Sequence, residues 1–183
     1  TVCDKHCKNL PLIITVNGVE LNEFVAPAGV TTINSRAFMG CSSITKVVDM
    51  ADVTTVGNRA FCECANLVSA NLEGVKVLED YAFNTCPLLA SVHLGSDVST
   101  IKSWTFYSAN SSLTEIYCRA TTPPSIYYNA NSGYGSFPYS AEIKVYVPRE
   151  AVDNYLQFTA CKDGRYKDNW YLYKDNILPY DFE

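Results

Sequence analysis

Hydrophobic positions recur along the chain with a period of 22 or 23 residues. The clearest marker is a dipeptide that occurs as Ala37-Phe38, Ala60-Phe61, Ala82-Phe83 and, with one substitution, Thr105-Phe106. Three residues after the Phe stands Cys41, Cys64, Cys86 or, in the fourth copy, Ala109. The aliphatic columns are Val30, Val53, Val75 and Val98; Ile33, Val56, Leu78 and Ile101; Ile44, Leu67, Leu89 and Leu113; and Val47, Ala70, Val92 and Ile116. Columns that keep register over four copies predict a solenoid, in which each copy is one coil.

The same columns predict the walls of each coil. Inward aliphatic residues alternate with outward polar ones over 46–48, 69–72, 91–94 and 115–118, which indicates strands. Successive strands would lie side by side as a parallel sheet. The segments from Ala-Phe to Cys carry apolar residues near helical spacing, so one or two helical turns are expected on the opposite wall. The predicted fold is a right-handed α/β solenoid of about four coils with a parallel β-sheet face, capped at both ends.

The two ends depart from the repeat and are expected to cap it. Residues 1–29 contain two short apolar runs around Asn17-Gly18, which predict a hairpin that covers the open edge of the first coil. The coils are assigned to residues 30–120. Residues 121–183 are expected to form the second cap, with a strand ending at Pro148, a short helix to about residue 158 and a Tyr-rich loop over 127–139.

Eight cysteines would suit a secreted disulfide framework, but their spacing argues against one. The three cysteines of the repeat column would form a ladder of buried thiols, because free Cys behaves as a small apolar residue. Cys118 shares an inward column with Leu72 and Leu94 and is expected in the core, whereas the pattern assigns no role to Cys62. The remaining bridge formers are Cys3, Cys7 and Cys161, of which Cys3 with Cys7 is the favoured pair.

Candidate chemistry is sparse. Cys3, His6 and Cys7 could offer ligands to zinc, but a closed site needs four, so a local disulfide or an irregular start is preferred. His93 lies in an outward strand column without a nucleophile or acid around it, and a solvated strand residue is the favoured interpretation. No Gly-rich phosphate loop, zincin motif or nucleophile elbow occurs in the sequence. We therefore expect no enzyme activity, no metal and no cofactor.

Composition and charge narrow the choice of partners. Hydrophobic residues make up 48% of the 183-residue chain, which supplies ample core. Fourteen Lys and Arg against nineteen Asp and Glu give a net charge of −5 without a basic run, so binding to nucleic acid is not expected. The apolar run from Leu10 to Val16 is far shorter than the ~20 residues of a spanning helix, so no membrane span is expected. The pattern carries no signal for an oligomeric state.

The pattern Val-x-x-Ile-x-x-x-Ala-Phe-x-x-Cys-x-x-Leu-x-x-Val over residues 21–119 resembles the BspA-like leucine-rich repeat, also called the Treponema pallidum type. Residues 122–124, 143–148, Tyr155 and Trp170 resemble the closing module of such arrays in Bacteroides-type proteins, although the Tyr-rich stretch departs from it. The family is found in surface proteins of anaerobic bacteria and some parasitic protists. The resemblance implies an extracellular or cell-surface binding protein, with an export signal or lipid anchor outside these residues.

Two surfaces are candidates for binding. The outward face of the predicted sheet carries two columns, Lys46, Ser69, Ser91 and Glu115, and Val48, Asn71, His93 and Tyr117. Solenoids commonly bind through such faces, although a merely soluble sheet face would show the same mixture. The second candidate is the Tyr-rich loop with Tyr127, Tyr128, Tyr134 and Tyr139. Its composition suits adaptable contacts, and the alternative is a long loop folded over the end of the solenoid.

These observations favour a non-catalytic recognition or adhesion module. Its ligand would be a host matrix protein or a glycan, because the candidate surfaces are mixed and carry no net charge of one sign. Some members of the family that the chain resembles act as adhesins for host matrix proteins. The alternative is a structural spacer or cap domain of a larger bacterial envelope protein, with no ligand of its own.

Overall fold

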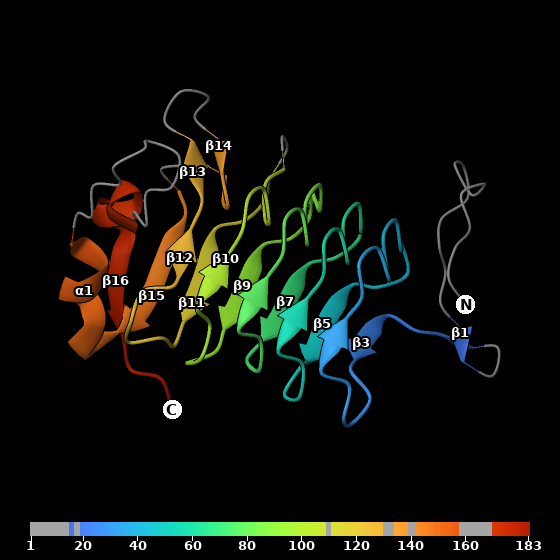
Figure 1. Ribbon diagram of the computed structural model, residues 1–183. Coiled ribbons are helices and arrows are strands. Elements are labelled where there is room, and N and C mark those ends of the chain that lie inside the picture. The colour runs from blue at the N-terminus through green and yellow to red at the C-terminus, as the bar shows by residue number, and fades with distance from the viewer. Residues whose placement is uncertain (1–14, 17–18, 109–110, 130–133, 139–141, 158–169) are drawn as a thin grey trace.

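The chain folds into a solenoid whose coils each contribute one strand to a long parallel sheet (Figure 1). The computed structural model describes residues 15–16, 19–108, 111–129, 134–138, 142–157 and 170–183. The long sheet has the order β16-β15-β11-β9-β7-β5-β3. Its strands are β3 (Glu23–Val25), β5 (Lys46–Asp49), β7 (Ser69–Leu72), β9 (Ser91–Leu94), β11 (Glu115–Cys118), β15 (Lys144–Pro148) and β16 (Ile177–Tyr180). The predicted solenoid with a parallel sheet face is confirmed.

A second parallel sheet of two-residue strands lines the next wall of each coil, in the order β12-β10-β8-β6-β4. Its strands are β4 (Thr32–Ile33), β6 (Thr55–Val56), β8 (Val77–Leu78), β10 (Thr100–Ile101) and β12 (Ser125–Ile126). The second residue of every strand is buried. The repeat pattern contains this inward column. A strand of two residues, however, shows no alternation from which it could be predicted.

The third wall, which holds the Ala-Phe pairs, consists of successive tight turns instead of the expected helical turns. The residue before the small residue of each pair has a left-handed backbone, with φ between 56° and 62° at Arg36, Arg59, Tyr81 and Trp104. A left-handed residue breaks the regular helical path, because helices need φ near −63° throughout. Backbone donors alternate instead between their own turn and the next coil. Cys62 N donates to Arg59 O at 3.2 Å, whereas Phe61 N donates to Ala82 O at 2.8 Å.

The Phe column forms a continuous stack of rings through the core. Ring centroids lie 5.1 Å apart for Phe38 and Phe61, 5.0 Å for Phe61 and Phe83, and 5.4 Å for Phe83 and Phe106. The interplanar angles are 14°, 7° and 13°, so the rings are nearly parallel. The spacing follows the ~4.8 Å separation of neighbouring strands, since every ring comes from the same position of its coil.

The cysteines of the repeat are buried free thiols, as predicted. The thiols of Cys64 and Cys86 donate to the carbonyl oxygens of Phe38 and Phe61, each at 3.2 Å, and so link each coil to the one before. Cys118 is also buried, with its sulfur 3.2 Å from the Tyr155 hydroxyl oxygen. Cys62, to which the pattern assigned no role, belongs to the buried set as well. The predictions for Cys3, His6, Cys7 and Cys161 lie outside the described residues.

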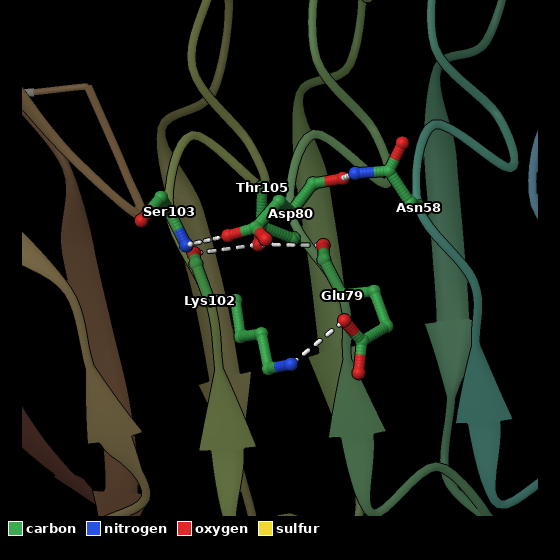
Figure 2. A network of polar contacts seen from close by, with 6 residues as sticks. All are labelled: Asn58, Glu79, Asp80, Lys102, Ser103 and Thr105. Carbon is green, nitrogen blue, oxygen red and sulfur yellow. Dashed lines mark hydrogen bonds and ion pairs between the residues drawn. The ribbon is translucent and has the colours of Figure 1, made fainter.

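Polar side chains link neighbouring coils at the bend between the short sheet and the turns (Figure 2). Asp80 accepts a hydrogen bond from Ser103 N on one carboxylate oxygen, and its carbonyl accepts another from Asn58 Nδ2, both at 3.0 Å. Lys102 and Glu79 form an ion pair of 2.8 Å nearby. The network therefore spans three coils. It satisfies polar groups where the backbone changes direction.

The far end of the solenoid is closed by η1 (Arg149–Ala151), α1 (Val152–Leu156) and η2 (Trp170–Asn176). The helix expected after Pro148 forms, but α1 ends at Leu156, because the backbone of Gln157 is extended. Tyr155 and Trp170 are buried against each other, with ring centroids 5.4 Å apart. Within the described part of the chain, no helix has the length and apolarity needed to cross a membrane.

At the other end, β1 (Thr15–Val16) and β2 (Val19–Glu20) pair antiparallel, as the hairpin prediction requires. The hairpin does not cover the edge of the sheet, however. It stands off the solenoid in Figure 1, and β3 is the edge strand. Phe24, Val30 and Phe38 are consequently only partly buried and line an apolar hollow of about 390 Å³. The division into caps at 1–29 and 121–183 stays a prediction, and the long sheet itself runs across both boundaries.

Candidate functional site

The long sheet places the predicted outward columns on two adjacent rows. Lys46, Ser69, Ser91 and Glu115 are direct neighbours in register, and Lys144 of β15 continues their row. In the second row, Asn71 pairs with His93, and His93 pairs with Tyr117. The register between β5 and β7 ends at Val47 and Ala70, so Val48 is not paired with Asn71 in this row. The structure therefore brings together seven of the eight predicted outward residues.

The second row becomes a row of stacked aromatic rings at its C-terminal end. His93 and Tyr117 have centroids 4.5 Å apart, and Tyr117 and Tyr146 have centroids 4.6 Å apart, with interplanar angles of 12° and 13°. We call His93, Tyr117 and Tyr146 the aromatic row. Tyr180 of β16 meets both tyrosines edge-on, at 5.4 and 5.6 Å. His93 is exposed and the two tyrosines of the row are half-buried, so the row is reachable from solvent.

Tyr146 and Tyr180 are members of this surface that the sequence did not reveal. Tyr146 alternates with buried Val145 and Val147 in the predicted strand, so its outward direction was readable. Its position beside Tyr117 could not be read from the sequence, because the two tyrosines are 29 residues apart, whereas the repeat step is 22 or 23 residues. The insertion hides the register from any count along the chain.

Charged residues border the aromatic row. The Arg119 side chain forms an ion pair with Glu73 at 3.0 Å, and the Tyr117 hydroxyl donates to Glu115 Oε2 at 3.3 Å. Burial, with the nearby Glu115 carboxylate, raises the pKa of the Tyr117 phenol, whereas burial lowers the pKa of His93. Both rings are therefore neutral at pH 7. The row offers apolar surface and hydrogen bonds, and its charge comes from the flanking residues.

The Tyr-rich segment turns out to build a fifth coil. Phe137 stacks on Phe106 with centroids 5.1 Å apart and an angle of 9°, and so extends the Phe column. Buried Ser136 anchors the segment, because its hydroxyl donates to Ile101 O at 2.8 Å and accepts from Tyr127 N at 2.8 Å. Sequence comparison missed this rung, since Phe137 follows Phe106 by 31 residues and Ser replaces Ala.

The three described tyrosines of this segment come from elements outside the long sheet. Tyr127 directly follows β12 and is half-buried, and Tyr128 and Tyr134 lie in the short antiparallel strands β13 (Tyr128–Asn129) and β14 (Tyr134–Gly135). Trp104 N donates to Gly135 O at 3.2 Å, which places this segment against the turn wall of the fourth coil. Tyr139 lies outside the described residues.

Nucleophilic and metal chemistry find little support on the described surface. Among the residues that the structure describes, no group of three or more His, Cys, Asp and Glu side chains could hold a metal ion. Burial raises the pKa of the Cys62 thiol to about 12, so this sulfur stays protonated at neutral pH. The arrangement on the outward face is suited to binding through shape, rings and hydrogen bonds.

Comparisons with known proteins agree with the repeat. A family model described as the BspA type leucine rich repeat region matches residues 16–134 with six copies. The pneumococcal vaccine antigen PcpA is similar at 15% identity and a TM-score of 0.46, over 86% of this chain and 40% of the antigen. A T. pallidum leucine-rich repeat protein is similar at 22% identity and a TM-score of 0.37, over 52% of this chain and 58% of that protein.

The chain thus spans less than two thirds of either solved protein. A search of curated proteins finds no significant match. The resemblance of the C-terminal part to a Bacteroides-type closing module stays a prediction. The family model alone covers well over half of the 183 residues. The protein therefore belongs to the BspA-type leucine-rich repeat family.

Proposed function

We propose that the protein is a recognition module that binds a protein partner through the outward face of its long sheet. The contact would be centred on the aromatic row and bordered by Asn71, Arg119 and the row of Ser69, Ser91 and Glu115. Scaffolds of this repeat class serve generally in protein interaction or adhesion. The finer proposal is an adhesin displayed outside the cell, with a host matrix protein as its partner.

The observation that carries this proposal is the aromatic row itself. Three rings are stacked on a rigid sheet, with neighbouring ring centroids no more than 4.6 Å apart. They present a large contact area, and their side chains lose little conformational entropy on binding. Tyr and Arg are also the side chains most enriched among residues that dominate protein interfaces. Nothing in the packing of the core requires rings at these outward positions, because the equivalent residue of β7 is Asn71.

The Tyr-rich segment is the weaker candidate for this role. Residues 136–137 of this segment belong to the fifth coil, since Phe137 and Ser136 are buried there. A ligand contact by Tyr128, Tyr134 or Tyr139 remains part of the proposal only as a second surface, apart from the aromatic row. We propose no catalytic role for any of these residues.

The test is a screen of the purified chain on arrays of host matrix proteins and of glycans, followed by affinity measurement for each hit. A double variant, Tyr117→Ala with Tyr146→Ala, is expected to weaken binding to the protein partner at least tenfold, or about 1.4 kcal/mol or more. Tyr81→Ala is the matched control, because Tyr81 is a half-buried ring on the turn wall. A glycan hit with the same dependence would correct the ligand class.

The alternative function, a spacer or cap domain without a ligand, predicts a different result. Such a chain would bind nothing on either array, and truncation of the aromatic row would change no affinity. If Tyr81→Ala weakened binding as strongly as the double variant does, that result would also contradict the proposed surface.

A further inference from the structure

Residues 181–183 leave the carboxyl end of β16 and run below the long sheet (Figure 1). Tyr180 ends β16 and packs edge-on against Tyr117 and Tyr146, with interplanar angles of 75° and 66°. The Phe182 ring follows at 4.8 Å from the Tyr180 ring. These residues, 180–183, are called the C-terminal segment below. Its Tyr180 lies against the aromatic row, on the surface to which the proposed function assigns the ligand.

Two arginines at the ends of neighbouring strands hold the C-terminal segment. Arg149, directly after β15, donates to both carboxylate oxygens of Asp181, at 3.0 and 2.8 Å. Arg119, directly after β11, donates to the backbone carbonyl of Glu183 at 2.8 Å. The guanidinium of Arg119 also lies 5.0 Å from the centroid of the Phe182 ring. Each residue of the segment therefore has its own contact.

These contacts follow rules that a peptide from another molecule could satisfy equally well. Alternate aromatic side chains meet rings or the face of a guanidinium, an acidic side chain between them meets Arg149, and a backbone carbonyl meets Arg119. A planar guanidinium suits both tasks, because it binds a carboxylate with two parallel hydrogen bonds and stacks on an aromatic ring.

The C-terminal segment can leave this site without opening the core. Tyr180 is 41% exposed, and the side chains of Arg149 and Asp181 are 63% and 74% exposed. Exposed ion pairs of this kind contribute little to stability. These weak contacts suffice because the segment is covalently tethered, since a short link supplies an effective concentration in the millimolar range.

We propose that the carboxyl edge of the long sheet over β11 and β15 is a docking site for an extended peptide with alternating aromatic and acidic side chains, and that residues 180–183 occupy it within the chain. This inference rests on the proposed function and names the chemistry of the partner: a protein that presents such a segment. The partner displaces the C-terminal segment when it binds, so the two compete.

The experiment compares the full chain with a variant that lacks residues 180–183. Each is titrated with the acetylated tetrapeptide Tyr-Asp-Phe-Glu while the backbone amide signals of Tyr117, Arg119 and Tyr146 are followed by NMR, which detects millimolar affinities. The shortened chain is expected to show saturable shifts at these residues. The full chain should need roughly tenfold more peptide for the same shifts, because its own segment competes.

Three controls make the outcome decisive. The peptide Ala-Asp-Ala-Glu keeps the acids and lacks the rings, so it should cause no saturable shift. Arg119→Lys in the shortened chain keeps the charge but loses the planar group, so peptide affinity should fall. Phe182→Ala in the full chain, which removes no backbone, should increase the response to the peptide.

Equal responses of the full and shortened chains would overturn the proposal, as would equal responses to the two peptides. The absence of saturable shifts in the shortened chain would overturn it as well. If that chain still bound an array partner through Tyr117, the recognition function would stand and only the peptide chemistry of the site would be refuted.

Discussion

The ring stack makes Phe61 the most informative position in the core. Its side chain is 0% exposed and stacks on Phe38 and Phe83 at 5.1 and 5.0 Å. Truncation of a buried Phe to Ala costs about 3–5 kcal/mol, which includes the cavity that is left behind. Each aromatic pair adds about 0.5–1.5 kcal/mol beyond the buried area. Because Phe61→Ala removes a ring from between two others, we expect a loss of about 5 kcal/mol, at the top of that range.

Urea unfolding followed by circular dichroism measures this loss directly. For a chain of this length each kcal/mol corresponds to about 2–4 °C in Tm, so thermal unfolding should shift by roughly 10–20 °C. Phe38→Ala is the matched control, because Phe38 is only partly buried at the open end of the same stack, and it should lose less. A loss below about 1 kcal/mol for Phe61→Ala, or a larger loss for Phe38→Ala, would refute the reasoning.

Burial raises the pKa of the Cys62 thiol from 9.0 to about 12, so the unfolded chain releases this proton first. The stability that this thiol contributes is therefore present below about pH 9 and falls as the pH rises towards 12. Urea midpoints measured at about pH 8 and about pH 10.5 test this. If the midpoint of Cys62→Ala fell by as much between the two pH values as that of the unchanged chain, the result would contradict it. Ser136→Ala removes the buried hydroxyl that donates to a carbonyl at 2.8 Å and should cost about 1–3 kcal/mol, whereas exposed Ser112→Ala should cost nothing measurable. Thr85 is exposed with a φ of 58°, so Thr85→Asn is expected to stabilise the chain by about 1 kcal/mol, and a lower Tm for that variant would disprove strain at this position.

The turn wall shows why the expected helical turns were wrong. Apolar residues at Ala60, Phe61 and Cys64 have spacings that a helix would also give, so the sequence alone does not distinguish the two structures. The left-handed backbone is carried by Arg59, Tyr81 and Trp104, which are residue types that rarely adopt it. Glycine occurs at none of these positions. At a second left-handed position, two residues after the Phe, one copy has Gly40 with a φ of 73°, whereas later copies have Glu63 and Thr85. About half of the hydrogen bonds of these turns go to the next coil, and those bonds exist only once the coils stack.

The aromatic row could likewise be predicted only in part. The outward direction of His93 and Tyr117 followed from alternation with buried Val92 and Ile116, so half of the surface could be predicted. Tyr146 and Tyr180 joined it through strand pairings across insertions, which no count along the chain reveals.

The period, the inward columns and the stacked rings and thiols follow from the order of the residues, because a repeated side chain at a repeated position must meet its copies when coils stack. The features outside the period depend on how the coils pack. This packing set Phe137 as the fifth rung, left the N-terminal edge at β3 open, and brought Phe182 and Glu183 onto Arg119. These contacts join residues far apart in the chain at no regular interval, and their energy comes from surfaces that exist only after the coils have packed.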